Sequence, residues 1–243
     1  MNESETRAEH IDPALKEAGW GVVEGSRIHR EYLIAPGRLE GYGLRAKPEI
    51  ADYILMYRNH KLGVIEAKAW NKPLTEGAAQ AKSYAGKMSI RFAYTTNGQG
   101  LYKIDMKRGK ESEIAAYPTP QELWDLTFTD QNDWRDRFAA VPFEDKSGTL
   151  GERYFRDIAI DRVLEAIAAE KRRILLTLAT GTGKTMIAFQ IAWKLFHSRW
   201  NLSREPTRRP RILFLADRNI LAKSSLQRVL PFLRGRPRTD RAR

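Results

Sequence analysis

The sequence contains no cysteine, so disulfide bonds and thiolate metal sites are excluded, which fits the reducing cytoplasm. It also lacks any apolar run approaching the roughly 20 residues that span a bilayer, so no membrane partner is expected. The acidic, polar start MNESETRAEH is unlike a signal peptide. The four histidines are scattered without the spacing of metal ligands. We therefore expect a cytoplasmic protein without a histidine or cysteine metal centre.

Positive charge is in clear excess. The 42 Lys and Arg residues against 30 Asp and Glu give a formal net charge of +12, which favours a polyanionic partner, with nucleic acid the leading candidate. Residues 204–243 carry twelve basic and three acidic residues of this total. This basic end is equally consistent with a solvated tail and with a segment that contacts phosphates. The tail alone therefore does not identify the partner.

Hydrophobic periodicity and turn residues divide the chain into two halves that mix helices and strands. In the first half we expect helices at 3–18 and 75–88, and strands at 27–34, 52–58, 62–70, 90–96 and 100–106. In the second half we expect helices at 152–170 and 184–198, and buried strands at 172–178 and 211–216. Strand, helix and strand in this order indicate a parallel βαβ unit. The polar stretch FEDKSGTLG separates the halves, which places domains at 1–145 and 152–243 and a linker at 146–151.

The most specific motif is LATGTGKT, residues 178–185, which follows an apolar run and precedes a predicted helix. Its glycines let backbone N–H groups face phosphates, and the start of the helix adds partial positive charge. Lys184 would neutralise the β- and γ-phosphates of ATP, and the Thr185 hydroxyl would ligate Mg²⁺. The strict pattern begins with glycine, where this chain has Leu178. The expected nucleotide-binding residues are Thr180, Gly181, Thr182, Gly183, Lys184 and Thr185.

This loop, with Arg153-Tyr154-Phe155 before it and RILFLADRNIL (211–221) after it, resembles the first motor motifs of superfamily 2 helicases. It is most similar to those of the motor subunit of type I restriction enzymes. In that family a glutamine just after the paired aromatics helps to read adenine, and the matching position here is Arg156. The resemblance also implies that the segment around Asp217-Arg218-Asn219 faces the DNA backbone.

The predicted second strand of this half is followed by only 27 residues. They contain no Asp-Glu pair on an apolar strand, which a superfamily 2 ATPase needs to hold Mg²⁺ and position water (the Walker B motif). We therefore expect an ATPase lobe that is incomplete in this chain, able to bind ATP but not to hydrolyse it alone.

A second constellation lies in the first half, with Asp52 on one predicted strand and Glu66 and Lys68 on the next. If the hairpin turns near His60, Asp52 sits opposite Lys68, and Glu66 shares their face of the sheet. Asp52, Glu66 and the Ala67 carbonyl would supply the hard oxygen ligands that Mg²⁺ prefers. The metal would acidify a bound water and stabilise charge on a scissile phosphate, while Lys68 would orient or deprotonate that water. The set resembles the active site of the PD-(D/E)xK nucleases.

Further site residues are suggested near this set. Gln80 and Tyr84, one helical turn apart, match the Gln-x-x-x-Tyr element of type I motor-subunit nucleases, which implies a role in contacting DNA or orienting the catalytic set. Without the resemblance they are a polar pair on an amphipathic helix. Glu5 and Glu9 share a helix face and either could reach the metal as a further ligand, with Glu5 the preferred choice. A solvated acidic face is the alternative.

Taken together, these patterns predict an α/β protein with a restriction-endonuclease-like nuclease domain followed by a partial RecA-like P-loop lobe. The resemblance implies Mg²⁺-dependent cleavage of duplex DNA, as in a type I site-specific deoxyribonuclease, with modification and specificity subunits as partners. Two alternatives remain open, a non-catalytic nucleic-acid-binding remnant and a stand-alone Mg²⁺-dependent nuclease. Metal-dependent nicking of plasmid DNA and titration with nucleotide separate these possibilities.

Overall fold

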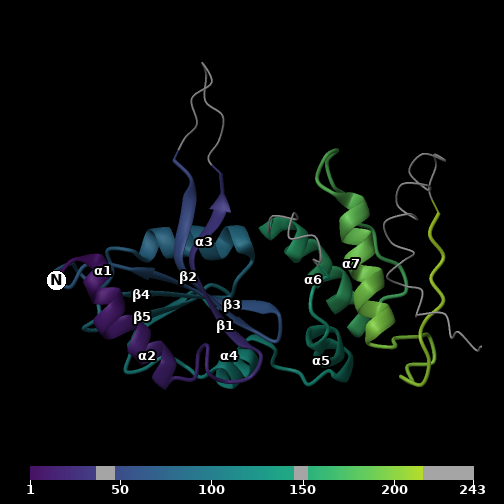
Figure 1. Ribbon diagram of the computed structural model, residues 1–243, viewed down its shortest axis with the longest axis horizontal. Helices are drawn as coiled ribbons and strands as arrows, with labels where there is room; N and C mark the ends of the chain where they lie inside the picture. Colours follow the sequence, from purple (N-terminus) through teal and green to yellow (C-terminus); the bar gives the residue numbers. More distant parts are fainter. Residues whose placement is uncertain (37–46, 145–152, 216–243) are drawn as a thin grey trace, which may run out of the picture. The chain divides into compact units, whose positions relative to one another are not determined.

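The computed structural model describes residues 1–36, 47–144 and 153–215, and their contacts separate two units (Figure 1). The first unit comprises Met1–Gln131 together with Arg153–Ile158, and the remaining described residues form the second. Within the described ranges, no helix is both long enough and apolar enough to cross a membrane. The contacts group residues 132–144 with the second unit, whereas the sequence pattern predicts them in the first domain, 1–145. The domain boundaries themselves stay a prediction.

The first unit is built around a six-stranded mixed sheet in which the strands lie side by side in chain order. Strands β3 (His60–Ala67) and β4 (Phe92–Thr96) are parallel, and all other neighbours are antiparallel. A parallel pair needs a crossover connection, which helix α3 (Ala78–Met88) provides. The strands are β1 (Ser26–Ala35), β2 (Glu49–Tyr57), β3 (His60–Ala67), β4 (Phe92–Thr96), β5 (Leu101–Asp105) and β6 (Lys110–Ile114). The predicted strands of this half are confirmed, while β6 was not predicted.

A helical segment at the start of the chain lies beside the sheet. It runs through α1 (Glu3–Thr6), the π-helical turn η1 (Arg7–Ile11) and α2 (Asp12–Glu17), which confirms the helix expected at 3–18. Asn2 and Glu5 form a capping box at its beginning. Ile11 and Leu15 are buried, so one stripe of the segment contributes to the core.

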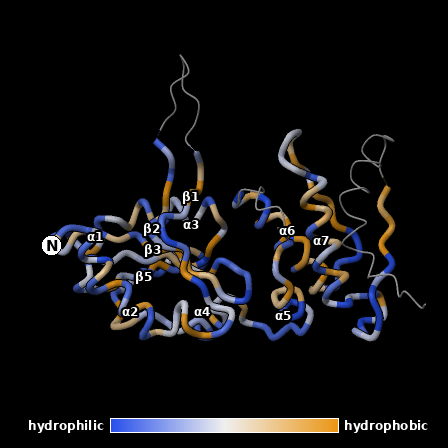
Figure 2. The backbone as a smooth tube through the Cα atoms, in the orientation of Figure 1, coloured by the Kyte–Doolittle hydropathy of each residue, from blue (hydrophilic) through white to orange (hydrophobic). Residues whose placement is uncertain are grey.

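The core of the first unit lies on both faces of the sheet, and Figure 2 shows apolar residues gathered in the strands. Beneath α3, small and branched side chains from the strands form one cluster with the helix. Its members include Ile54, Val64, Ala81, Ala85, Met88, Ala93 and Ile104. Helix α4 (Pro120–Thr127) lies against β2 and β3, and a side chain at Gly63 would contact its Leu123. The first residues of α6 also belong here, since Asp157 pairs with Lys61 of β3.

The second unit is helical in its described part, with α5 (Asp133–Ala140), α6 (Tyr154–Ala168) and α7 (Lys184–His197). The helices expected at 152–170 and 184–198 are confirmed as α6 and α7. Apolar side chains of the three helices share one cluster, which includes Trp134, Phe138, Ile160, Leu164 and Ile187. The buried Lys194 of α7 donates hydrogen bonds to the Phe138 and Val141 carbonyls, so α7 also binds the end of α5.

The two strands predicted for this second unit are wrong within the described residues. Neither 172–178 nor 211–215 is in a strand, and residue 216 lies outside the described ranges. Leu175 is 92% exposed and Leu213 is 82% exposed, and Figure 2 shows the apolar character of this second segment. An apolar run becomes a buried strand only when neighbouring strands take its backbone hydrogen bonds and helices cover its faces. The described part of this unit supplies no such strands, so the expected βαβ unit is not formed there.

Candidate functional site

The hairpin of β2 and β3 sets the geometry of the candidate site. It turns at Arg58 and Asn59, whose positive φ angles of 49° and 61° suit a two-residue hairpin turn. One extra residue, Leu62, is accommodated by a register shift, after which Tyr53 pairs with Ile65. Continued by one residue, this register places Asp52 beside Glu66. The prediction that Asp52 sits opposite Lys68 is therefore wrong by two positions, because the earlier turn shifts the partner of Asp52 by three positions and the bulge restores one.

The predicted convergence of these three side chains is nevertheless found, since a shift of two positions preserves the face of the sheet. The Asp52 carboxylate accepts a hydrogen bond from the Ala67 N–H at 2.7 Å, which ties the ends of the two strands together. The Lys68 ammonium donates to Glu66 Oε1 at 2.8 Å. Glu66 itself is only 3% exposed. Two carboxylates and an amine thus meet at the end of β3.

Burial dominates the electrostatics of this cluster. It raises the pKa of Glu66 to about 7, although the hydrogen bond from Lys68 opposes the shift. Burial also raises the pKa of Asp52, against the lowering effects of the Ala67 N–H and of Arg7. For Lys68 burial favours the neutral amine, but the bond to Glu66 and the charges of Asp52 and Glu3 raise its pKa overall. Without a metal the site therefore holds a protonated lysine beside carboxyl groups that resist full ionisation.

The donor set fits a hard divalent cation such as Mg²⁺. Glu66 Oε2 is buried and has no hydrogen-bond partner among the described residues. Burying an unpaired carboxylate oxygen is costly, so a cation or a proton donor at this oxygen would stabilise it. Asp52 and Glu66 offer the carboxylate oxygens that Mg²⁺ prefers. No group of three or more His, Asp or Glu in the described ranges has metal-binding geometry. Backbone carbonyl and water oxygens would therefore complete the coordination shell.

The start of the chain contributes to the site through residues that the sequence analysis did not select. Arg7 donates to Asp52 Oδ1 at 2.8 Å and also pairs with Glu3. The charge of Glu3 acts on Asp52, Glu66 and Lys68. Glu5, the preferred extra metal ligand, instead accepts a hydrogen bond from the Asn2 N–H in the helix cap. The structure therefore brings Glu3 rather than Glu5 to the carboxylate cluster. In the sequence, the i, i+4 spacing of Glu3 and Arg7 was the one pattern that could have indicated this ion pair.

The predicted Gln80–Tyr84 pair lies on helix α3, which follows Glu66 and Lys68 along the chain. Gln80 donates to the Tyr84 hydroxyl at 2.9 Å, so the two side chains act as one polar unit. Gln80 is exposed, whereas Tyr84 is 8% exposed and belongs to the core cluster under α3. A Cβ atom at Gly77, the N-cap of the helix, would lie 2.8 Å from Glu66 Cγ. The first turn of α3 therefore packs on the carboxylates, although neither Gln80 nor Tyr84 hydrogen-bonds to them in the described structure.

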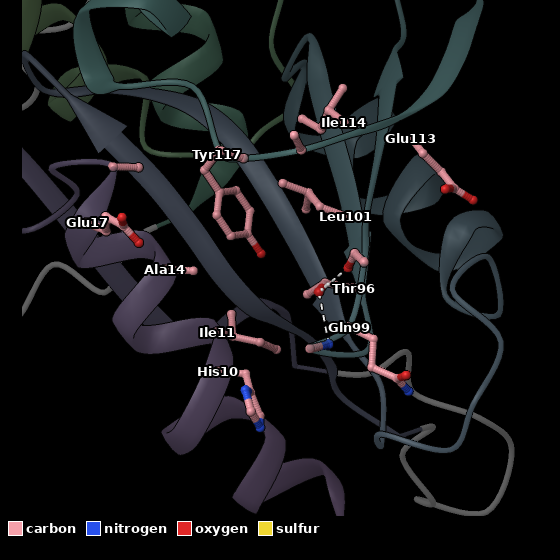
Figure 3. A pocket seen from close by; sticks show the side chains of 15 residues that line it. His10, Ile11, Ala14, Glu17, Thr96, Gln99, Leu101, Glu113, Ile114 and Tyr117 are labelled. Atoms are coloured by element: carbon pink, nitrogen blue, oxygen red, sulfur yellow. Dashed lines mark hydrogen bonds between the residues drawn. The ribbon is translucent and has the colours of Figure 1, made fainter.

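A cavity of about 510 Å³ lies beside the helical segment at the start of the chain (Figure 3). The figure shows Ile11 and Ala14 of this segment on one side and Thr96 and Leu101 of the sheet on the other. The Tyr117 side chain points into the space, and its buried hydroxyl has no hydrogen-bond partner among the described residues. None of the predicted catalytic residues lines this cavity. The helical segment is thus incompletely packed along part of its length.

The predicted phosphate loop precedes α7. Gly181 and Gly183 have positive φ angles of 77° and 86°, and Gly183 is the N-cap of the helix. Thr182 closes the turn by donating to the Ala179 carbonyl at 2.8 Å. Lys184 and Thr185 stand exposed on the first turn, while Thr180 lies at the turn before it. The free N–H groups of a helix start, with an exposed lysine and threonine, fit a nucleotide phosphate bound with Mg²⁺.

Comparisons with known proteins bear on both units. Residues 150–239 match the family described as the Type III restriction enzyme, res subunit. The EcoAI endonuclease subunit of a type I restriction enzyme from Escherichia coli is 32% identical over 234 residues, which cover 91% of this chain and 28% of the relative. The EcoKI endonuclease subunit from Escherichia coli strain K12 is 31% identical over 171 residues, which cover 63% of this chain and 13% of the relative.

A solved structure is also similar. It is the fragment structure of an HsdR subunit of a type I restriction enzyme from Vibrio vulnificus YJ016, with 37% sequence identity and a TM-score of 0.80. The similarity covers 91% of this chain and 43% of that one. The chain is thus homologous to type I endonuclease subunits and carries a helicase-like ResIII region. It spans only 28% and 13% of the two curated relatives.

Proposed function

We propose that this homologue of type I restriction endonuclease subunits cuts duplex DNA with Mg²⁺ at Asp52, Glu66 and Lys68. The observation that carries the proposal is the convergence of the three side chains around a buried Glu66 oxygen without a hydrogen-bond partner. The homology to endonuclease subunits and the net charge of +12 support DNA as the substrate. In this proposal residues 1–145 are a PD-(D/E)xK nuclease domain and 152–243 the start of a RecA-like lobe.

In the proposed reaction Asp52 and Glu66, with the Ala67 carbonyl, would hold Mg²⁺. The bound metal supplies an acidified water and neutralises charge on the scissile phosphate. Lys68 acts from the same face as an ammonium, since its hydrogen bond to Glu66 and the nearby carboxylates raise its pKa. It thereby keeps Glu66 ionised and stabilises the phosphate charge, which we favour over proton abstraction by the amine. Gln80 and Tyr84 orient the DNA or the catalytic set from α3.

The second half contributes a nucleotide site in this proposal. Thr180, Gly181, Thr182 and Gly183 form the loop around the ATP phosphates, Lys184 neutralises them, and Thr185 holds Mg²⁺. The ResIII match over residues 150–239 and the geometry at the start of α7 support this assignment. Modification and specificity subunits are the proposed partners, because the relatives are subunits of type I restriction enzymes.

A plasmid-nicking assay with and without Mg²⁺ tests the nuclease proposal on the purified chain. We expect Asp52→Ala, Glu66→Ala and Lys68→Ala each to reduce cleavage by about a hundredfold or more, because each removes a ligand or the charged amine. Glu49→Ala is the matched control, since Glu49 also lies on β2 but pairs with Lys87 on the surface. Full activity of Lys68→Ala, with contaminating nucleases excluded, would sink the assignment.

Two outcomes of the same assay point to the alternatives. DNA binding by the parent chain without metal-dependent nicking would indicate a non-catalytic nucleic-acid-binding protein. Nicking without any binding of ATP would indicate a Mg²⁺-dependent nuclease that does not use nucleotide. The assay is therefore paired with a titration of labelled ATP on the same preparation.

A further inference from the structure

Besides Lys68, the structure places a second cation, Arg7, at the carboxylate cluster. Its Nη2 lies 2.8 Å from Asp52 Oδ1, and the same nitrogen pairs with Glu3. Its Nη1 lies 3.6 Å from Glu31 Oε1. The side chain is 23% exposed, and its Nε is buried without a hydrogen-bond partner among the described residues. The guanidinium thus stands among carboxylates with donor capacity left over.

Both oxygens of Asp52 are engaged in this arrangement. Oδ2 accepts from the Ala67 N–H, and Oδ1 accepts from Arg7. A divalent cation that coordinates Asp52 must approach the same oxygens, and it would meet the positive charge of the guanidinium at short range. Arg7 and a metal ion therefore compete for Asp52. In the metal-free protein, Arg7 also offsets the repulsion between Asp52 and its acidic neighbours.

We propose that Arg7 is a positioning residue that holds the Asp52 carboxylate in place until a divalent cation displaces it. The proposal rests on the metal site proposed above. Displacement breaks an ion pair between the helical segment and β2, so metal binding loosens the start of that segment. Two features give the segment room to respond, namely the π-helical turn that begins at Arg7 and the cavity beside Ile11 and Ala14 (Figure 3).

The test measures binding of Mn²⁺, as a probe of the Mg²⁺ site, by calorimetry on the full chain in mildly alkaline buffer. Arg7→Gln removes the competing charge and keeps a polar side chain, so we expect about fivefold tighter Mn²⁺ binding. Arg30→Gln is the matched control, because Arg30 also ties the helical segment to the sheet, through a 2.8 Å ion pair with Asp12. Its Mn²⁺ affinity should equal that of the parent. Equal or weaker binding by Arg7→Gln overturns the proposal.

Hydrogen exchange on the parent protein supplies a readout that does not depend on the variant folding. Addition of Mn²⁺ should speed exchange of the amides in Glu3–Ile11, and an unchanged rate there contradicts displacement. Arg7→Lys, which keeps the charge, should bind Mn²⁺ as weakly as the parent. If Glu66→Gln abolishes Mn²⁺ binding and Arg7→Gln leaves it unchanged, the metal site stands and only the role of Arg7 is rejected. Absence of any Mn²⁺ binding by the parent rejects the metal site and this proposal with it.

Discussion

Among single residues, the burial of Glu66 should make the free energy of unfolding depend on pH. Its pKa of about 7 in the folded protein exceeds the usual value of 4.5, so between these pH values the folded state binds more protons than the unfolded chain. The free energy of unfolding should therefore decrease as pH rises from about 4.5 to about 7. Glu66→Gln should flatten this decrease. Urea unfolding at several pH values in a metal chelator measures both slopes.

A control for this experiment must carry a carboxylate with the opposite shift. Glu111 fits, because its hydrogen bond to Lys82 lowers its pKa, and such a group cannot make stability fall with rising pH. Glu111→Gln should therefore not flatten the decrease. The same slope in the parent and in Glu66→Gln would contradict the argument.

The polar pair on α3 yields a second prediction at this scale. Tyr84→Phe removes only the hydroxyl that accepts from Gln80, whereas Tyr84→Ala would also empty part of the core. We expect Tyr84→Phe and Gln80→Ala to reduce DNA cleavage about tenfold while changing the unfolding free energy by no more than about 1 kcal/mol. Nicking assays and denaturant unfolding measure the two effects. Variants that cut and bind DNA as well as the parent would remove this pair from the site.

At the scale of elements, the approach of α3 to β3 depends on the absence of a side chain at Gly77. An added Cβ would lie 2.8 Å from Glu66 Cγ and 3.3 Å from Lys68 Cε, so either the helix or these side chains must shift. Gly77→Ala should therefore weaken Mn²⁺ binding about tenfold, through displaced carboxylate geometry. Gly86→Ala is the matched control on the same helix, since nothing lies within 4 Å of its added Cβ.

The control should bind Mn²⁺ as the parent does and gain up to about 1 kcal/mol of stability, because alanine favours a helix interior over glycine. Calorimetry and thermal unfolding on the two variants separate a local clash from a general effect on α3. Unchanged Mn²⁺ affinity in Gly77→Ala would mean that the helix yields without moving Glu66.

Elements with a strong local pattern were predictable from the sequence, and those that depend on distant partners were not. The initial helix and the strands of the first unit follow from apolar spacing and turn residues. The register of Asp52 was wrong because the turn lies at Arg58 and Asn59 rather than at His60, and the one-residue bulge, which has no local signature, corrects only part of that shift. Arg7 was missed because its partner Asp52 is 45 residues away. Runs 172–178 and 211–215 look like buried strands, but their state depends on neighbours that the described residues do not provide.

For the whole molecule, the nucleotide loop at residues 178–185 leads to a prediction about ATP binding. The chain should bind labelled ATP weakly through the loop amides, and Lys184→Ala should weaken binding at least about tenfold, because it removes the charge that faces the phosphates. Lys171→Ala, another exposed lysine of the same unit, should bind as the parent does. Equal ATP binding by Lys184→Ala and the parent would contradict this role of the loop.

The pairing of β2 with β3, including its bulge, constrains how the lengths of these two strands can change. Thirteen residues separate Asp52 from Glu66, and both must point to one face although strands alternate their sides at every step. A single insertion or deletion within either strand would turn one carboxylate to the opposite face, unless the bulge at Leu62 were lost or doubled in compensation, whereas a change in the turn at Arg58 and Asn59 would alter only the loop length. Changes of two residues would leave the pair aligned. Length variation within these strands among working relatives should therefore come in even steps or with an altered bulge, whereas the length of the turn can change by single residues.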